Sequence, residues 1–251
     1  MPEITKHEPG TFCWIELAVP DRRAAQQFYT SLFGWTTNEV PMGEDEPYVM
    51  LEKDGRNVGA LYQSAQAPPN WLSYINVESV DDSAKRARDL GATLLQEPFD
   101  VMDVGRMAVV QDGQGAVFAV WQPKSHPGIG VRDEVGTLCW NELMTTDVEA
   151  AQKFYESLFG WQLKVTPGYT EAHVGGKAIG GLMQIAPEMH GMPSHWKPYF
   201  MVENVDAAVK KAQSLGVTEL FGPMDIPEVG RFAIINDPQG AAFAVITLSH
   251  H

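Results

Sequence analysis

Two tryptophan–glutamate pairs in this chain combine a binding surface with a reactive group. Trp14 is followed two positions later by Glu16, and Trp140 by Glu142. Residues i and i+2 of a β-strand face the same way, so each pair places a carboxylate beside an indole ring. An apolar wall with one acid fits a flat aromatic or carbonyl-bearing small molecule. A carboxylate against indole can have a raised pKa, which makes Glu16 and Glu142 the candidate general acid/base residues.

The same pairs have a structural interpretation, which the sequence leaves open. In that interpretation the tryptophans fill the core, and the glutamates form ion pairs with Arg106 and Arg231. Each of these arginines follows a Val-Gly dipeptide. A guanidinium group is planar and binds carboxylates in a bidentate manner, so its partner is either a glutamate of the chain or an acidic group on the ligand.

The predicted strands at 71–77 and 196–202 supply further candidates for the wall of a binding site. Each contains a Trp and, three positions later, a Tyr, and whether these belong to the core or to the wall is open. His195, just before the second of these strands, and Lys197 within it take the places of neutral residues in the first copy, so we expect the C-terminal site to be the more active one. The candidate ligand-binding residues are Trp14, Trp140, Trp71, Trp196, Tyr74, Tyr199, Arg106, Arg231, His195 and Lys197.

These candidates recur because the chain contains one sequence unit twice. About two-thirds of the positions in 10–35 are identical to those in 136–161, and such a match at a fixed shift indicates two copies of one structural unit. The length of 251 residues allows two copies of ordinary domain size. We predict a tail at 1–9, domains at 10–122 and 136–248, and a linker rich in Pro and Gly at 123–135.

Within each copy, the pattern predicts two units of the order strand, helix and three strands. In the first unit, a strand at 12–19 leads to a helix that starts at the N-cap Asp21 and ends at Gly34 as a left-handed cap. In the second unit we expect the helix to be capped by Asp81. The second copy repeats this order, with helices capped by Asp147 and Asp206.

Two motifs point to a known superfamily. The pattern D…A..FY..LFGW occurs at 21–35 and 147–161, and the closing motifs DGQGAVFAV and DPQGAAFAV occur at 112–120 and 237–245. They resemble motifs of the vicinal oxygen chelate superfamily, which includes glyoxalase I, bleomycin-resistance proteins and extradiol dioxygenases. The resemblance covers nearly the whole chain. The doubled W-x-E-L strand and Val-Gly-Arg are similar to a two-domain glyoxalase-like subgroup that is often labelled hydroxylase.

This resemblance implies the fold class and bears on metal binding. It implies an α+β fold with tandem glyoxalase-like domains, each made of two βαβββ units whose sheet forms a U-shaped half-barrel with helices outside. Metal-dependent members carry His or Gln on the first and fifth strands and Glu on the last. The corresponding positions are Trp14, Trp140, Leu72, Lys197, Ala119 and Ala244. Because Trp and Ala cannot coordinate a divalent ion and a lone Lys is a poor ligand, we expect no metal and no cofactor.

Three functions remain open at this stage. The first is a metal-independent lyase, isomerase or hydroxylase that acts on an aromatic or carbonyl-bearing molecule, with Glu as acid or base. The second is a non-catalytic protein that sequesters an aromatic drug or metabolite, as bleomycin-resistance proteins do. The third is a scaffold with vestigial clefts. The first two functions need a small-molecule ligand, and the scaffold needs a protein partner.

Bulk composition excludes other classes of partner. The formal net charge of −14 disfavours nucleic acid and anionic membranes, both of which need clustered Lys and Arg. No apolar run is long enough to span a bilayer, and the start of the chain lacks the features of a signal peptide. We therefore expect a cytoplasmic protein, either a monomer with an internal pseudo-dimer or a homodimer. Cys13 and Cys139 hold equivalent positions without ligand spacing, which predicts buried structural thiols.

Overall fold

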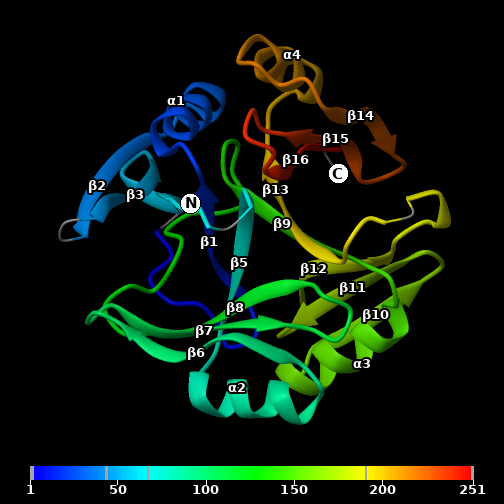
Figure 1. Ribbon diagram of the computed structural model, residues 1–251. Coiled ribbons are helices and arrows are strands. Elements are labelled where there is room, and N and C mark those ends of the chain that lie inside the picture. Colours follow the sequence, from blue (N-terminus) through cyan, green and yellow to red (C-terminus); the bar gives the residue numbers. More distant parts are fainter. Residues whose placement is uncertain (1–2, 43–44, 67, 190, 250–251) are drawn as a thin grey trace.

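The computed structural model describes residues 3–42, 45–66, 68–189 and 191–249, and its two halves each form an eight-stranded sheet (Figure 1). The first sheet contains β1 (Phe12–Val19), β2 (Thr36–Met42), β3 (Asp45–Lys53), β4 (Arg56–Gln63), β5 (Asn70–Asn76), β6 (Thr93–Val101), β7 (Gly105–Gln111) and β8 (Val117–Pro123). The second contains β9 (Leu138–Thr145), β10 (Gln162–Thr166), β11 (Tyr169–Val174), β12 (Lys177–Gln184), β13 (His195–Met201), β14 (Leu220–Ile226), β15 (Gly230–Asn236) and β16 (Ala242–Leu248).

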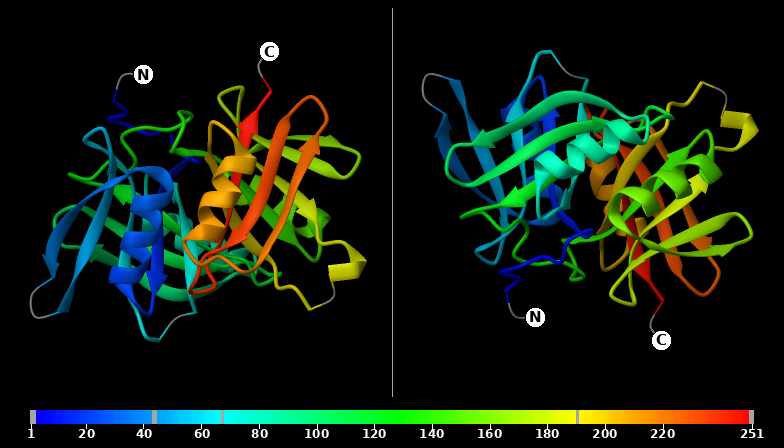
Figure 2. Two further views of the ribbon diagram at one scale, coloured as in Figure 1. Left: turned by 90° about the horizontal axis from the view of Figure 1, so that it is seen from above. Right: turned by 90° about the horizontal axis from the view of Figure 1, so that it is seen from below.

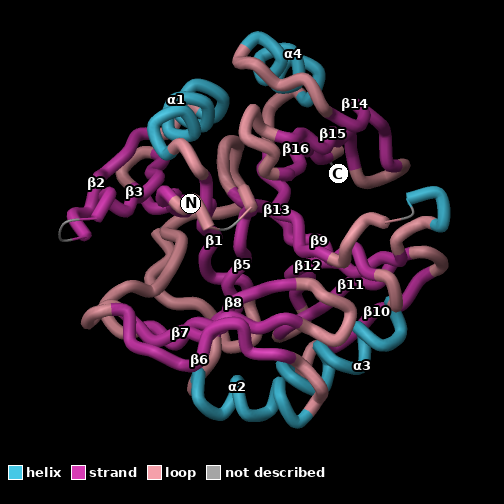
Figure 3. The backbone as a smooth tube through the Cα atoms, in the orientation of Figure 1, coloured by secondary structure: helices cyan, strands magenta, loops and turns pink. Residues whose placement is uncertain are grey.

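Four helices lie at the outside of the molecule (Figure 3). They are α1 (Arg22–Phe33), α2 (Val80–Asp89), α3 (Val148–Phe159) and α4 (Val205–Ser214), and the short 3-10 helix η1 (Pro187–Met189) follows β12. The order along the chain is β-α-β-β-β four times, which confirms the predicted tandem α+β architecture. His250 and His251 lie outside the described residues, and we include them in no site.

The strand order places the first and fifth strands of each half at the centre of its sheet. The first sheet runs β2-β3-β4-β1-β5-β8-β7-β6, and the second runs β10-β11-β12-β9-β13-β16-β15-β14. β1 is parallel to β4 and antiparallel to β5, and β9 has the same relation to β12 and β13. The two units of each half therefore meet along one antiparallel strand pair, and the strands that carry the Trp–Glu pairs lie in the middle of the sheets.

The helix ends follow local sequence signals, with one correction in each half. Asp21 accepts a hydrogen bond from the backbone N–H of Ala24, and Gly34 ends α1 with φ 74°, as predicted. For α2, the N-cap is Ser79, not Asp81 as we expected, and in α4 Asn204 takes that place. Ser and Asn accept from the backbone as well as Asp does. The acids two positions later lie in the first helical turn, where the helix dipole favours them.

The repeated helix motif forms the contact between the two halves. The Tyr29 hydroxyl donates to Asp237 Oδ2 over 2.9 Å, and the Tyr155 hydroxyl donates to Asp112 Oδ2 over 3.0 Å. Oδ1 of each aspartate accepts backbone N–H groups of its own closing turn. Each half thus binds the closing turn of the other, and α1 lies beside α4 while α2 lies beside α3 (Figures 1 and 2).

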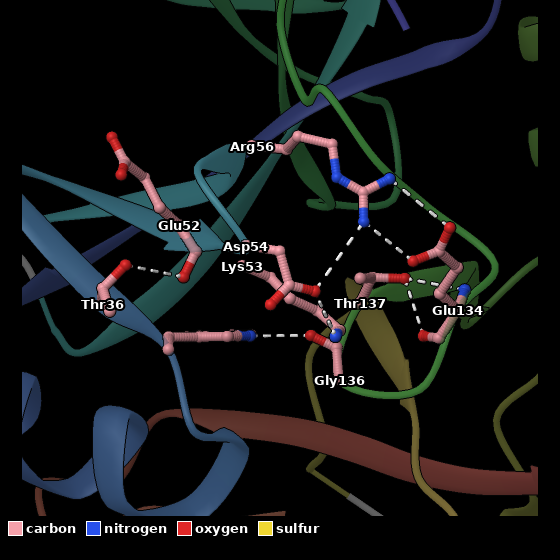
Figure 4. A network of polar contacts seen from close by, with 9 residues as sticks. Thr36, Glu52, Lys53, Asp54, Arg56, Glu134, Gly136 and Thr137 are labelled. Carbon is pink, nitrogen blue, oxygen red and sulfur yellow. Dashed lines mark hydrogen bonds and ion pairs between the residues drawn. The ribbon is translucent and has the colours of Figure 1, made fainter. Parts of the chain in front are cut away.

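The start of the second half is held against the turn between β3 and β4 (Figure 4). Arg56 Nη2 lies 3.0 Å from Glu134 Oε2, and the Thr137 hydroxyl donates to the Glu134 carbonyl over 2.8 Å. The carbonyl of Gly136 accepts from the indole Nε1 of Trp35 over 2.7 Å. These contacts fix the end of the connection between the halves.

Burial matches the predicted role of the two cysteines. Cys13 and Cys139 are free and buried, and burial raises the pKa of the Cys139 thiol to about 12. A thiol with so high a pKa is a poor nucleophile at neutral pH. Among the helices in the described part of the chain, none has the length and apolar character needed to cross a membrane.

Candidate ligand pocket in the N-terminal half

A pocket of about 930 Å³ lies in the first sheet. This volume is at the upper end of the range of small-molecule sites, which is roughly 300–1,000 Å³. Its wall is mostly aromatic rings, methionines and aliphatic side chains, supplied by several strands of the sheet. The rings and the histidine that line it are Trp14, Tyr48, Tyr62, Tyr74, Phe99, Trp121 and His126.

Glu16 is an acid of this pocket that two tyrosines hold. The Tyr74 hydroxyl donates to Glu16 Oε1 over 2.6 Å, and the Tyr48 hydroxyl donates to Oε2 over 2.8 Å. Tyr48 in turn accepts from Trp14 Nε1 over 3.1 Å. The strand pairing explains part of this cluster, because Trp14 and Tyr74 are directly opposite on β1 and β5.

The electrostatics of the cluster follow from burial. Loss of water raises the pKa of Glu16, and the hydrogen bonds from Tyr74 and Tyr48 oppose this rise. Burial and the nearby Glu16 carboxylate raise the pKa of both tyrosines well above the ordinary value. The phenols therefore stay protonated and act as donors, while the carboxylate has an increased affinity for a proton.

The glycine of the Val-Gly-Arg motif makes room for one wall of the pocket. A Cβ at Gly105 would lie 2.1 Å from Cζ2 of Trp121, so the indole packs directly on the glycine backbone. Trp121 Nε1 donates to the carbonyl of His126 over 3.1 Å. The glycine thus allows a close ring–backbone contact that places Trp121 in the wall.

The C-terminal half repeats the cluster and adds a cation. Glu142 accepts from Tyr199 over 2.7 Å and from Tyr169 over 3.3 Å. Lys197, which is opposite Glu142 on β13, places Nζ 3.9 Å from Glu142 Oε1 and is only 2% exposed. Burial lowers the pKa of Lys197, and the charge of Glu142 opposes this shift. The N-terminal half has Leu72 in that register, so its Glu16 lacks this ion pair.

We predicted that the C-terminal cleft is the more active site because it has His195 and Lys197. The pocket of about 930 Å³ lies instead in the N-terminal half. His195 Nδ1 lies 2.9 Å from the Pro193 carbonyl, at the start of β13. Another pocket, of about 430 Å³, is lined by the β14–β15 turn and the end of β16, and Glu142 is not among its lining residues.

Two of the predicted wall residues, Trp71 and Trp196, do not line the pocket. Trp71 and Trp196 are buried, and their Nε1 groups donate to the hydroxyls of Tyr29 and Tyr155 over 3.0 and 2.9 Å. The reason is strand geometry, because residues three positions apart on a strand point to opposite faces. Since Tyr74 faces the pocket, Trp71 faces the contact between the halves and belongs to the core.

Arg106 and Arg231 do not pair with Glu16 and Glu142, and they do not line the pocket. Arg106 binds Asp81 through Nε and Nη2, each over 2.8 Å, and Arg231 binds Asp206 at 2.8 and 3.1 Å. They pair with the acids in the first turns of α2 and α4, and not with the glutamates on the central strands. These bidentate pairs join a strand to a helix on the outer side of each sheet.

Several pocket residues were absent from our candidate set. Tyr48 and Tyr62 lie on segments that the pattern predicts as strands, but their register against β1 depends on the sheet order. Trp121 is the residue after the closing motif, and its aromatic character was the available signal. His126 lies in the segment that we predicted as a linker, where no periodic pattern indicates which side chains point inward.

The polar groups of the pocket do not fit a divalent cation. The positions that the superfamily resemblance implies as metal ligands hold Trp14, Leu72 and Ala119 in this half. Both oxygens of Glu16 accept one tyrosine hydrogen bond each, so each already has a neutral donor. Within the described ranges, no group of three or more His, Cys, Asp or Glu residues is placed to hold a metal ion. The side chains of Trp, Leu and Ala at those three positions supply none of the imidazole and carboxylate ligands that such ions prefer.

Fold and site together define a tandem glyoxalase-like protein, and comparison with known proteins agrees. Residues 137–245 match the family model described as Glyoxalase/Bleomycin resistance protein/Dioxygenase superfamily, and residues 14–121 match a glyoxalase-like domain. The chain belongs to this superfamily. A Mycobacterium tuberculosis protein named "Putative glyoxylase CFP32" is 37% identical over 98% of both chains. The anthracycline biosynthesis protein DnrV of Streptomyces peucetius is 33% identical over 98% of this chain and 96% of its own.

Solved structures show the same fold at low sequence identity. The 2,3-dioxygenase LapB from Pseudomonas sp. KL28 aligns with a TM-score of 0.68 and 15% identity, over 98% of this chain and 95% of its own. A Mn(II)-bound glyoxalase from Novosphingobium aromaticivorans aligns with a TM-score of 0.65 and 13% identity, over 98% of this chain and 83% of its own. At such identities the likeness concerns the fold, and the activity has to be argued from the pocket.

Proposed function

We propose that the N-terminal pocket binds a flat aromatic or carbonyl-bearing small molecule without a metal, and that Glu16 serves as its acid/base group. The observation that carries this proposal is the position of Glu16, held by Tyr48 and Tyr74 in a pocket of about 930 Å³ walled by aromatic rings. Flat rings bind well between aromatic walls, and one buried polar group fixes their orientation.

The chemistry that this cluster supports is proton transfer. A Glu16 carboxylate with a raised pKa can take a proton from a C–H or O–H group next to a carbonyl of the ligand. The same carboxyl group can return that proton to another atom of the ligand, which gives an isomerisation or, with loss of a leaving group, an elimination. Tyr48 and Tyr74 hold the carboxylate in one orientation in both states.

The relatives support an aromatic ligand. DnrV is named for anthracycline biosynthesis, and anthracyclines are polycyclic quinones with phenolic hydroxyl groups. Glu52 lines the pocket together with Glu16, and Glu46 lines it as well but pairs with Arg22 at 3.3 Å. The charges of Glu16 and Glu52 favour a cationic ligand such as an amino sugar conjugate over an anionic one. We therefore take an amine-bearing anthracycline as the first probe.

The test measures binding and conversion of doxorubicin and of its uncharged aglycone. We expect both to quench tryptophan fluorescence in a saturable manner, since Trp14 and Trp121 line the pocket. Glu16→Gln should weaken this binding or abolish conversion while the far-UV circular dichroism stays unchanged. Binding and conversion should persist after dialysis against a strong chelator. A Glu16→Gln protein that equals the wild type in both would refute the proposal.

A second candidate function is sequestration of an aromatic molecule without chemistry. It is favoured by the two tyrosine hydrogen bonds to Glu16, which leave the carboxylate oxygens already occupied by donors. Stoichiometric binding with no product by chromatography after long incubation would support it. Absence of binding by every planar aromatic probe would instead support the scaffold function.

A further inference from the structure

Tyr62 is the tyrosine of the pocket wall whose hydroxyl the Glu16 cluster does not use. Among the described residues, three tyrosines line the pocket, and the hydroxyls of the other two, Tyr48 and Tyr74, donate to Glu16. Within the same part of the chain, the Tyr62 hydroxyl makes no hydrogen bond, and it is not among the polar atoms that burial shuts off from solvent. It is therefore a donor that a ligand in the pocket can reach.

The register of β4 turns Tyr62 to the same side of the sheet as Glu16. Ala60 is paired with Glu16 on the parallel strand β1, and Tyr62, two positions further, shares its face. Leu61, between them, is fully buried and points the other way. Since two residues of a strand rise about 6.6 Å and adjacent strands lie about 4.8 Å apart, the two side chains leave the sheet within about 8 Å of each other. One group of a ligand can therefore meet both.

The Tyr62 ring is held by the cluster that it adjoins. It stacks on the ring of Tyr48, with 6.2 Å between centroids and 23° between planes. Burial and the charge of Glu16 raise the pKa of Tyr62 to about 12, so the phenol stays protonated at neutral pH. The hydroxyl is thus available as a hydrogen-bond donor to an acceptor on the ligand.

The C-terminal half carries a thioether at the position of this hydroxyl. There Gly181 is paired with Glu142 on β9, and Met183, two positions further, corresponds to Tyr62. The acid of that half lies beside the buried Lys197. The half with the large pocket therefore has, near its acid, a donor that is open to a ligand in place of a buried cation.

We propose that Tyr62 is a second catalytic residue of the N-terminal pocket, whose hydroxyl donates to the carbonyl oxygen of the ligand while Glu16 removes a proton from the adjacent carbon. This inference rests on the proposed function of the same pocket, and it narrows the ligand class to planar molecules with a C–H group next to a carbonyl.

The proposed step balances without a co-reactant. The electrons of the broken C–H bond form a C=C bond, and the carbonyl oxygen takes the negative charge. A donor aimed at such an oxygen stabilises the charge as it develops, which is the role of the Tyr62 hydroxyl. The Glu16 carboxyl group then returns the proton to another atom of the ligand, so nothing is oxidised or reduced.

The experiment measures deuterium exchange in the bicyclic ketone 2-tetralone by proton NMR. Its protons between the aromatic ring and the carbonyl are those that Glu16 would take. The wild type should exchange them faster than buffer in a saturable manner, and Glu16→Gln should abolish this. Tyr62→Phe keeps the stacked ring and loses only the hydroxyl, so its maximal rate should fall about 100-fold. Its affinity for tetralin, the same frame without the carbonyl, should equal that of the wild type by quenching of tryptophan fluorescence.

The controls separate the possible failures. Tyr169→Phe makes the same exchange on β11 of the other sheet and should leave the rate unchanged. An undiminished maximal rate in Tyr62→Phe would overturn the inference, and so would an equal loss of affinity for tetralin and the ketone at an unchanged maximal rate, because the ring would then only pack. In both cases the role of Glu16 would stand on the Glu16→Gln result. A wild type no faster than buffer would refute the acid/base function together with the inference.

Discussion

The Tyr74 hydroxyl donates to Glu16 Oε1 over 2.6 Å, from the strand antiparallel to the one that carries the glutamate. The same relation recurs between Tyr199 and Glu142 at 2.7 Å. The two halves thus share one acid cluster but differ in its surroundings. One carboxylate lies in a large pocket without a cation, and the other is buried beside Lys197.

The two glutamates should respond differently to the same substitution. Glu16→Gln removes a carboxylate whose charged form is disfavoured by burial, so stability should be unchanged or slightly higher while ligand affinity falls. Glu142→Gln leaves Lys197 buried without its counter-ion and should lower the free energy of unfolding by about 3 kcal/mol. Urea denaturation and calorimetric titration of both variants measure these effects. Equal destabilisation by the two variants would contradict the prediction.

Binding should depend on pH through Glu16. Its folded pKa is raised above the ordinary 4.5, so its contribution to stability is present below pH 4.5 and is lost as pH rises through the folded pKa. Binding of a hydroxyl by the ionised carboxylate has the opposite trend and should strengthen as pH rises through that pKa. His126, with a pKa of about 4, stays neutral from about pH 5 to 8. Affinity for the uncharged aglycone of doxorubicin should increase in the wild type as pH rises from 4.5 through the folded pKa of Glu16, and it should be flat in Glu16→Gln.

Gly105 should be intolerant of even one methyl group. A Cβ at this position would lie 2.1 Å from the Trp121 ring, so Gly105→Ala must displace the indole from the pocket wall. We expect a loss of about 1–3 kcal/mol of stability, with weaker ligand binding. Gly113→Ala is the matched control, because a Cβ there meets no atom within 4 Å. Similar unfolding midpoints for the two variants would show that Trp121 can move freely.

The contact between the halves should depend on Tyr29. Tyr29→Phe removes the donor to Asp237 Oδ2 and the acceptor for Trp71 Nε1, while it keeps the ring. A hydrogen bond to a charged group contributes about 1.5–3 kcal/mol, and we expect a loss of this size. The double variant with Asp237→Asn should lose less than the sum of the single variants. Strictly additive losses in urea denaturation would indicate that the two residues are not coupled.

Periodic and local signals made most of the fold predictable. The exact repeat of Phe-Tyr…Leu-Phe-Gly-Trp gave two copies, and Asp21 and Gly34 marked the ends of α1 because capping depends on the adjacent backbone alone. We predicted Asp81 as the N-cap of α2, but the structure has Ser79 there, because both residue types favour helix starts. Alternation along β1 was enough to place Trp14 and Glu16 on one face of the strand.

The candidate site was predictable only along single strands. The sequence by itself determined that Trp14 and Glu16 share a face, since that depends on a two-residue spacing. Only the tertiary structure decided that Tyr48 and Tyr74 reach Glu16, because the partner of a strand depends on the order of strands in the sheet. It also decided that Trp71 faces the contact between the halves. Which of two equivalent carboxylates lies in a pocket depends on side chains from many distant segments, and no local pattern contains that information.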